Sequence, residues 1–137
     1  MAVRVEDVVL QFVDAINHAD LRCLAALMTE GHVFIDSDGS QVTGRSAMLD
    51  AWSQYFSMMR DYRVTVREMF SSANTVVLVG TAEGVWAKTS PSDHGSRWSV
   101  PAAWRAVVDG ATIAVWQVFV NPEPIRAALR GDGGSAA

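Results

Sequence analysis

The sequence predicts an α+β domain in which three N-terminal helices pack on a curled, mostly antiparallel sheet. Apolar residues recur with helical spacing over most of the first 60 residues. From Tyr62 onward, segments rich in β-branched and aromatic residues alternate with short turn-forming stretches. Helices followed by a run of strands, rather than alternating helix and strand, are typical of α+β folds.

Length and composition predict one globular domain. The chain has 137 residues, of which 50% are hydrophobic and 19% charged, and this composition excludes a disordered chain. Domains most often hold about 100–150 residues. We expect a single domain over 1–130 and a small, polar, flexible tail over 131–137.

Two helices are expected before the first strand. The first carries an apolar stripe with spacings of three and four residues: Val5, Val8, Val9, Phe12, Val13 and Ile16. Asp20 is a suitable N-cap for a second, shorter helix. The core face expected for this second helix consists of Leu21, Leu24, Leu27 and Met28.

A short strand, a hairpin turn and a third helix should follow. The apolar stretch "HVFID" (32–36) is expected to be a strand, and the pair Asp38–Gly39 is a hairpin signal. After Gly44 the apolar period becomes helical again. The predicted core side of this third helix is Met48, Leu49, Trp52, Phe56 and Met59.

Four further strands are expected at 62–70, 75–87, 96–108 and 111–120. Strand alternation predicts inward faces made of Trp98, Val100, Ala102, Trp104 and Ala106, and of Ala114, Trp116, Val118 and Val120. Arg97, Arg105 and Gln117 fall on the opposite faces. A proline interrupts sheet ladders, so Pro101 is expected to mark a bulge. A sheet this long must curl to bury its apolar face against the helices.

Several classes of function are excluded or disfavoured. The net charge is −4 and the basic residues are scattered, so we expect no nucleic-acid partner. No apolar run reaches the roughly 18 residues that span a bilayer, and no signal-peptide pattern begins the chain, so no membrane partner and a cytoplasmic location are expected. The lone Cys23 excludes an internal disulfide and is expected to be buried and inert. His18, His32 and His94 lack metal-ligand spacing, and no nucleotide-binding motif is present, so neither a metal nor another cofactor is predicted.

This order of elements resembles the nuclear transport factor 2-like superfamily, and in particular its ketosteroid isomerase-like and SnoaL-like members. The stretches that carry the resemblance are "FVDAINHADLRCLAALMTEGHVFID", "VTGRSAML" and "VPAAWRAVVDGATIAVWQVFVNPEPIR". The resemblance implies a cone-shaped fold with an internal pocket, a final short proline-flanked helix and a homodimer formed through the sheet. The fold hosts isomerases, dehydratases, cyclases, epoxide hydrolases and non-catalytic modules, so it does not select one activity.

The resemblance transfers only some residues of the known sites. A gapless match to ketosteroid isomerases puts Asp36 at the catalytic base and Phe12 where those enzymes have a tyrosine. Their second oxyanion donor falls near Ala103 or Trp104, and only the Trp104 indole could donate. Epoxide hydrolases of this fold use an Arg-x-Asp pair, which Arg105 does not complete. Steroid isomerisation by the familiar mechanism and epoxide hydrolysis are therefore disfavoured.

Three residues are the candidate catalytic groups. Asp36, at the end of an apolar strand, could be a general acid or base, or it could cap the hairpin or bind Arg45. Asp38 is interpreted as a turn residue. His32 could act as acid, base or neutral donor or be structural, and Tyr55 could orient a ligand carbonyl or merely pack.

The aromatic residues suggest a pocket for a flat, apolar molecule, although such residues also form ordinary cores. The candidate ligand-binding residues are Phe12, Trp52, Trp86, Trp98, Trp104, Trp116 and Asn121, with Glu83 as a further polar candidate.

Two functions remain open from the sequence. The first is a small hydrophobic ligand-binding protein, either non-catalytic or a cofactor-free isomerase, cyclase or dehydratase that uses Asp36 on a cyclic ketone or polyketide-like substrate. The second is a non-catalytic binding or dimerisation module that works through the open sheet face around Val115, Gln117 and Phe119. The second predicts that Asp36 bonds to its own turn and that large side chains fill the cone.

Overall fold

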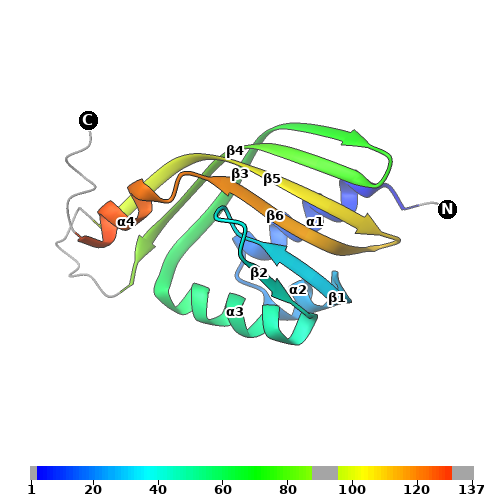
Figure 1. Cartoon of the computed structure of the whole chain (residues 1–137), viewed down its shortest axis with the longest axis horizontal. Helices are drawn as coiled ribbons and strands as arrows, with labels where there is room; N and C mark the ends of the chain where they lie inside the picture. Colours follow the sequence, from blue (N-terminus) through cyan, green and yellow to red (C-terminus); the bar gives the residue numbers. More distant parts are fainter. Residues whose placement is uncertain (1–2, 88–95, 131–137) are drawn as a thin grey trace.

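A computed structural model describes residues 3–87 and 96–130 of the chain. Within them, four helices and one six-stranded sheet form an α+β fold (Figure 1). The elements are α1 (Val5–Asn17), α2 (Leu21–Ala26), β1 (Met28–Ile35), β2 (Gln41–Thr43), α3 (Arg45–Met58), β3 (Met59–Ser72), β4 (Thr75–Trp86), β5 (Arg97–Asp109), β6 (Thr112–Val120) and α4 (Glu123–Arg130). The α+β class is as predicted, and α4 adds a helix to the three N-terminal ones. The expected tail at 131–137 lies outside the described residues.

The sheet has the strand order β2-β1-β6-β5-β4-β3. All neighbouring pairs are antiparallel except β1 and β6, which run parallel. Helix α3 contacts β1 and β2 at one side of the sheet and β3 at the other. The sheet therefore curls around α3 without closing, and Figure 1 shows it arched above that helix.

The expected first helix is confirmed, and its apolar stripe lies on the inner face of the sheet. Helix α1 buries Val8, Val9, Phe12, Val13, Ala15 and Ile16, and it contacts β3 to β6. Asp20 caps α2 as predicted, because its Oδ1 accepts a hydrogen bond from Cys23 N at 3.0 Å. Helix α2 ends one residue before Leu27, however, so Met28 belongs to β1 and pairs with Ile113 rather than extending the helix.

One expectation about side-chain burial and one about a helix boundary are wrong. Cys23 is exposed, because the six-residue helix α2 buries only Leu24 and turns its other face to solvent. A hydrogen bond to Asp20, with some desolvation, raises the pKa of the thiol, so Cys23 is less reactive than a typical exposed cysteine. Met59, assigned to the third helix from its spacing, is buried as expected but begins β3.

The β5 alternation agrees with the prediction, whereas β6 contains a bulge. In β5, Trp98, Val100, Ala102, Trp104, Ala106 and Val108 are all buried. The register with β6 shifts between Val107 and Val108, so Ala114 has no β5 partner, and Ile113 rather than Ala114 is completely buried. Pro101 does not mark a bulge: β4 pairs through it without a shift, and it lies just past the last β6 partner, at Ala102.

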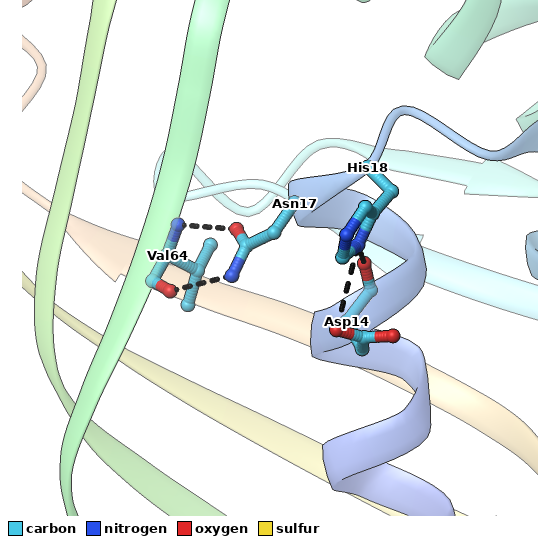
Figure 2. Close-up of polar contacts among 4 residues, drawn as sticks. All are labelled: Asp14, Asn17, His18 and Val64. Atoms are coloured by element: carbon cyan, nitrogen blue, oxygen red, sulfur yellow. Dashed lines mark hydrogen bonds and ion pairs between the residues drawn. The ribbon is translucent and has the colours of Figure 1, made fainter.

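Two structural devices position β3, which carries one side of the site. Asn17, the last residue of α1, donates through Nδ2 to Val64 O at 3.0 Å and accepts through Oδ1 from Val64 N at 2.8 Å (Figure 2). The Asn17 side-chain amide thus pairs with the Val64 backbone at the sheet edge, as the backbone of a neighbouring strand would. Gly80 is the second device, since a Cβ there would lie 1.8 Å from Thr65 O. Only glycine permits this close approach, next to the β3 bulge at Arg67.

No helix among the residues in 3–87 and 96–130 is long and apolar enough to cross a membrane.

Candidate functional site

A cavity of about 440 Å³ lies between the curled sheet, α3 and α4. All five tryptophans of the chain line it: Trp52, Trp86, Trp98, Trp104 and Trp116. Most of the remaining wall is aliphatic or aromatic, with few polar groups. A concave, apolar site with a few polar groups is the usual form of a small-molecule site.

The strand directions place the polar groups of the cavity at one end of the molecule. Because β1 and β6 run parallel, their last residues reach the same edge, where Ile35 pairs with Gln117. Asp36 follows β1 there, and α4 follows β6. The Trp86 indole N–H donates to Ile125 O at 2.9 Å and so holds α4 against the end of β4. We call the group Asp36, Tyr55, Tyr62 and Arg126 the open end.

Asp36 lies where the cavity meets solvent. Its side chain is exposed rather than buried, yet it lines the cavity. Its Oδ1 accepts from Ser37 N at 2.7 Å, and its backbone bonds to Ser40 and Gly39 close the hairpin. Arg45 does not pair with it but donates to Met28 O at 3.5 Å. Asp36 therefore both shapes the turn and presents a carboxylate to the cavity.

Tyr55 and Tyr62 both line the cavity and contact each other edge-on, with ring centroids 5.0 Å apart. Burial raises the pKa of Tyr55 well above its usual range, and the neighbouring Tyr62 and the charge of Asp36 raise it further. Burial and the Asp36 charge raise the pKa of Tyr62 in the same way. Within the described residues neither hydroxyl has a hydrogen-bond partner. Both phenols are neutral at physiological pH, which leaves their O–H groups able to donate to a ligand.

Sequence reasoning missed two residues of the open end, Tyr62 and Arg126, although a signal for Tyr62 was present. The signal was strand alternation: Val64 is buried on the inner face of β3, and Tyr62 precedes it by two residues. The bulge between Arg60 and Arg63 obscures this alternation in the sequence.

His32 and Phe12 lie behind the cavity wall instead of in it. Both are completely buried and their rings lie 6.0 Å apart, while Phe12 packs on Trp116 at 4.8 Å. His32 Nδ1 lies 2.7 Å from Ile113 O, so Nδ1 carries the proton and donates. Burial lowers the pKa of His32, partly offset by this bond. We call Phe12, His32, Ile113 and Trp116 the closed end; a direct ligand contact by Phe12 or His32 has no support in this geometry.

The five tryptophans differ in what their indole N–H groups can do. Trp86 donates to Ile125 O, and Trp98 donates to Met59 Sδ at 2.9 Å. The N–H of Trp52 is buried without a partner among the described residues. Trp104, the suggested replacement donor, is 1% exposed and lines the cavity, with no hydrogen bond in the described part of the chain.

The remaining polar candidates lie away from the cavity. Asn121 Oδ1 accepts from Glu123 N at 3.1 Å and so caps α4, and Asn121 is not part of the cavity wall. Glu83 is half-buried on β4 and does not line the cavity either. Arg105 points to the outer face, where it donates to Gln117 Oε1 at 3.3 Å.

The residues that the structure describes contain no cluster of three His, Cys, Asp or Glu side chains that could hold a metal ion. His94 lies outside them.

The chain was compared with known proteins by sequence and by structure. The SnoaL-like domain profile matches residues 9–116, whereas no curated protein matches the chain. A hypothetical protein of Catenulispora acidiphila with a ketosteroid isomerase-like fold, solved with trimethylamine, is 19% identical, with a TM-score of 0.76 over 93% of this chain and 92% of that one. A protein of Shewanella putrefaciens assigned as a SnoaL-like polyketide cyclase is 13% identical, with a TM-score of 0.79 over 95% and 98% of the two chains. An LEH-like epoxide hydrolase of M. tuberculosis is also 13% identical, with a TM-score of 0.74 over 93% and 87%.

At these identities the solved structures show the fold alone, while the profile covers most of the chain. The chain belongs to the SnoaL-like domain family.

Proposed function

We propose that the chain binds a small, hydrophobic ring ketone of the polyketide type in its cavity and moves a proton on it without a cofactor. The observation that carries this proposal is the combination of one carboxylate, Asp36, with two neutral phenols, Tyr55 and Tyr62, on an otherwise largely apolar wall. The five tryptophans that line the cavity suit flat rings.

The proposed chemistry begins with a proton on a carbon next to the ketone. The Asp36 carboxylate accepts this proton, and the ketone becomes an enolate whose oxygen carries the negative charge. The O–H groups of Tyr55 and Tyr62 donate to that oxygen. Such aimed donors are each worth several kcal/mol of transition-state stabilisation, about 3–4 in acyl transfer. Return of the proton to another carbon gives isomerisation. Attack by the enolate carbon on a second carbonyl gives cyclisation, and the proton on Asp36 then goes to the new alkoxide oxygen.

The family resemblances support this class of reaction over epoxide opening. Several similar structures carry polyketide cyclase assignments, including the Shewanella protein. Arg105 does not supply the strand Arg-x-Asp pair implied by the epoxide hydrolase resemblance, because it is followed two residues later by Val107 and faces outward.

Hydrogen–deuterium exchange into 1-tetralone tests the proposal without knowledge of the natural substrate. NMR in D₂O would follow loss of the C2 proton signal. We expect the protein to accelerate exchange over buffer, and Asp36→Asn to remove the acceleration. The asparagine Oδ1 still accepts from Ser37 N, so the hairpin is retained.

Asp38→Asn is the matched control, since Asp38 lies two residues away and bonds to Ser40 N at 2.9 Å without lining the cavity. It should leave exchange unchanged. Binding of 1-tetralone without accelerated exchange would contradict the enzymatic part of the proposal and leave a non-catalytic binding protein. Full exchange activity in Asp36→Asn would assign the base to another group.

We also propose a homodimer through the outer face of the sheet. Val79, Ala103 and Phe119 are aligned across β4, β5 and β6, and Phe119 is 49% exposed. An aligned apolar row of this kind is suited to burial against a second copy. Light scattering after gel filtration would show a dimer that Phe119→Arg converts to a monomer, and a monomeric wild-type protein at tens of micromolar would contradict the proposal.

A further inference from the structure

Arg126 is the only cationic side chain among the described residues that line the cavity. It lies on α4 at the open end, where Trp86 holds the helix in place through Ile125. Within the described residues its guanidinium forms no hydrogen bond or ion pair. The other arginine of α4, Arg130, is bound to Glu123 Oε1 at 2.6 Å and does not line the cavity.

The charge of Arg126 reaches the hairpin on the other side of the cavity mouth. The pKa of Asp38 is lowered mainly by hydrogen bonds from Ser40, and Arg126 contributes a smaller effect in the same direction. Asp36 and Asp38 thus make this side of the mouth negative. The carboxylates repel an anionic ligand here, and the positive charge of Arg126 offsets this repulsion.

We infer that the ligand carries a carboxylate beyond its apolar rings and that Arg126 binds this group. The inference rests on the proposed function and narrows its substrate class from neutral ring ketones to ring-containing keto acids. An arginine fork matches a carboxylate with two parallel hydrogen bonds. In this arrangement the rings contact the tryptophans, the ketone lies near Asp36 and the tyrosines, and the carboxylate remains at the α4 side of the mouth.

A pair of probes of matched shape tests the inference: 2-naphthoate, which is anionic, and 2-naphthamide, which is neutral. Isothermal titration calorimetry at pH 7 would give the Kd of each probe for wild type, Arg126→Gln, Arg126→Lys and Arg130→Gln. We expect Arg126→Gln to raise the Kd of 2-naphthoate about tenfold, in line with the usual contribution of hydrogen bonds to charged groups. We expect the same substitution to change the Kd of 2-naphthamide by less than about twofold. Arg126→Lys keeps the charge but not the fork, so it should recover only part of the loss, and Arg130→Gln should leave the binding of both probes unchanged.

The outcomes separate this inference from the proposed function. If both probes bind and Arg126→Gln weakens neither, or weakens both alike, the carboxylate assignment is overturned while the cavity remains a binding site. If neither probe binds the wild-type protein, ring binding in the cavity fails and the inference fails with it. Circular dichroism of each variant establishes that a lost affinity is not a lost fold.

Discussion

The closed and open ends both contain aromatic side chains but differ in what covers them. At the closed end α1 lies on the sheet, and Phe12, His32, Ile113 and Trp116 are each no more than 1% exposed. At the open end, Asp36, Tyr55, Tyr62 and Arg126 surround a hollow between the sheet, α3 and the short helix α4. Trp116 of the closed end connects the two ends, since it packs on Phe12 and also lines the cavity.

This contrast shows that the role of an aromatic residue depends on what packs over it. A ring covered by α1 contributes to stability, whereas a ring that faces the cavity contributes to a binding surface. Strand β1 runs from one end to the other: His32 lies on it, and Asp36, four residues later, directly follows its last residue. The ring at residue 32 is sealed beneath Phe12, whereas the carboxylate at residue 36 reaches solvent. Substitutions should therefore change stability at the closed end and ligand binding at the open end.

The largest effect should come from Phe12→Ala, which would lower the free energy of unfolding by about 3–5 kcal/mol because it leaves a void in a sealed core. Urea denaturation followed by tryptophan fluorescence would measure it. Phe12→Tyr is the informative companion: a hydroxyl placed here lacks a partner and should cost about 1–3 kcal/mol without adding exchange activity. Faster tetralone exchange in Phe12→Tyr would show that residue 12 reaches the cavity after all.

A smaller loss, about 2 kcal/mol, is expected for Asn17→Ala, which removes two hydrogen bonds to the Val64 backbone at about 1 kcal/mol each. This contact fixes β3 two residues from Tyr62, so ketone binding should weaken as well. His18→Ala is the control, because His18 is exposed and bonds only within α1, to Asp14 (Figure 2). Its unfolding free energy should stay within about 0.5 kcal/mol of wild type. Equal losses in the two variants would remove the special role of Asn17.

The buried His32 should make the closed end sensitive to acid. Burial lowers the pKa of His32 in the folded state, so the unfolded chain takes up a proton near pH 6.5 before the folded one does. Stability is therefore complete above about pH 6.5 and falls as the pH decreases through the folded pKa, by at most about 1.4 kcal/mol per pH unit. Denaturation curves between pH 7 and 5 would show this slope, and His32→Gln should flatten it. The pKa values of three carboxyl groups are also lowered, but these groups change the pH dependence of stability only below about pH 4.5: Glu6, Asp20 and Asp38.

The smallest effects on stability are expected at the open end. Tyr55→Phe and Tyr62→Phe remove hydroxyls that have no protein partner in the described residues, so unfolding free energies should change by less than about 0.5 kcal/mol. Each substitution should still weaken the binding of 1-tetralone by about 1 kcal/mol, which is roughly a fivefold increase in Kd. The binding of tetralin, which lacks the carbonyl, should not change. Calorimetry would measure both ligands. An equal loss for tetralin would mean that the tyrosines shape the cavity and do not donate to the ketone.

Local patterns in the sequence were sufficient for most of the secondary structure. The stripe of α1, the Asp20 cap, the Asp38–Gly39 turn and the β5 alternation each depend on neighbours a few residues apart, and all four appear in the structure. The errors lie where distant segments decide. Met28 pairs with Ile113, and the bulge at Ala114 turns Ile113 inward, so neither outcome follows from the spacing around those residues.

For the site, the sequence by itself identified the tryptophans, Asp36 and Tyr55, since residue type and family resemblance sufficed. Only the tertiary structure determined which candidates share a cavity. It added Tyr62 and Arg126 to the wall and placed His32, Phe12 and Asn121 outside it. The physical reason is that the curl of the sheet, the cover supplied by α1 and the parallel course of β1 and β6 are long-range features. They bring residues 36, 55, 62 and 126 to one end, which no local period encodes.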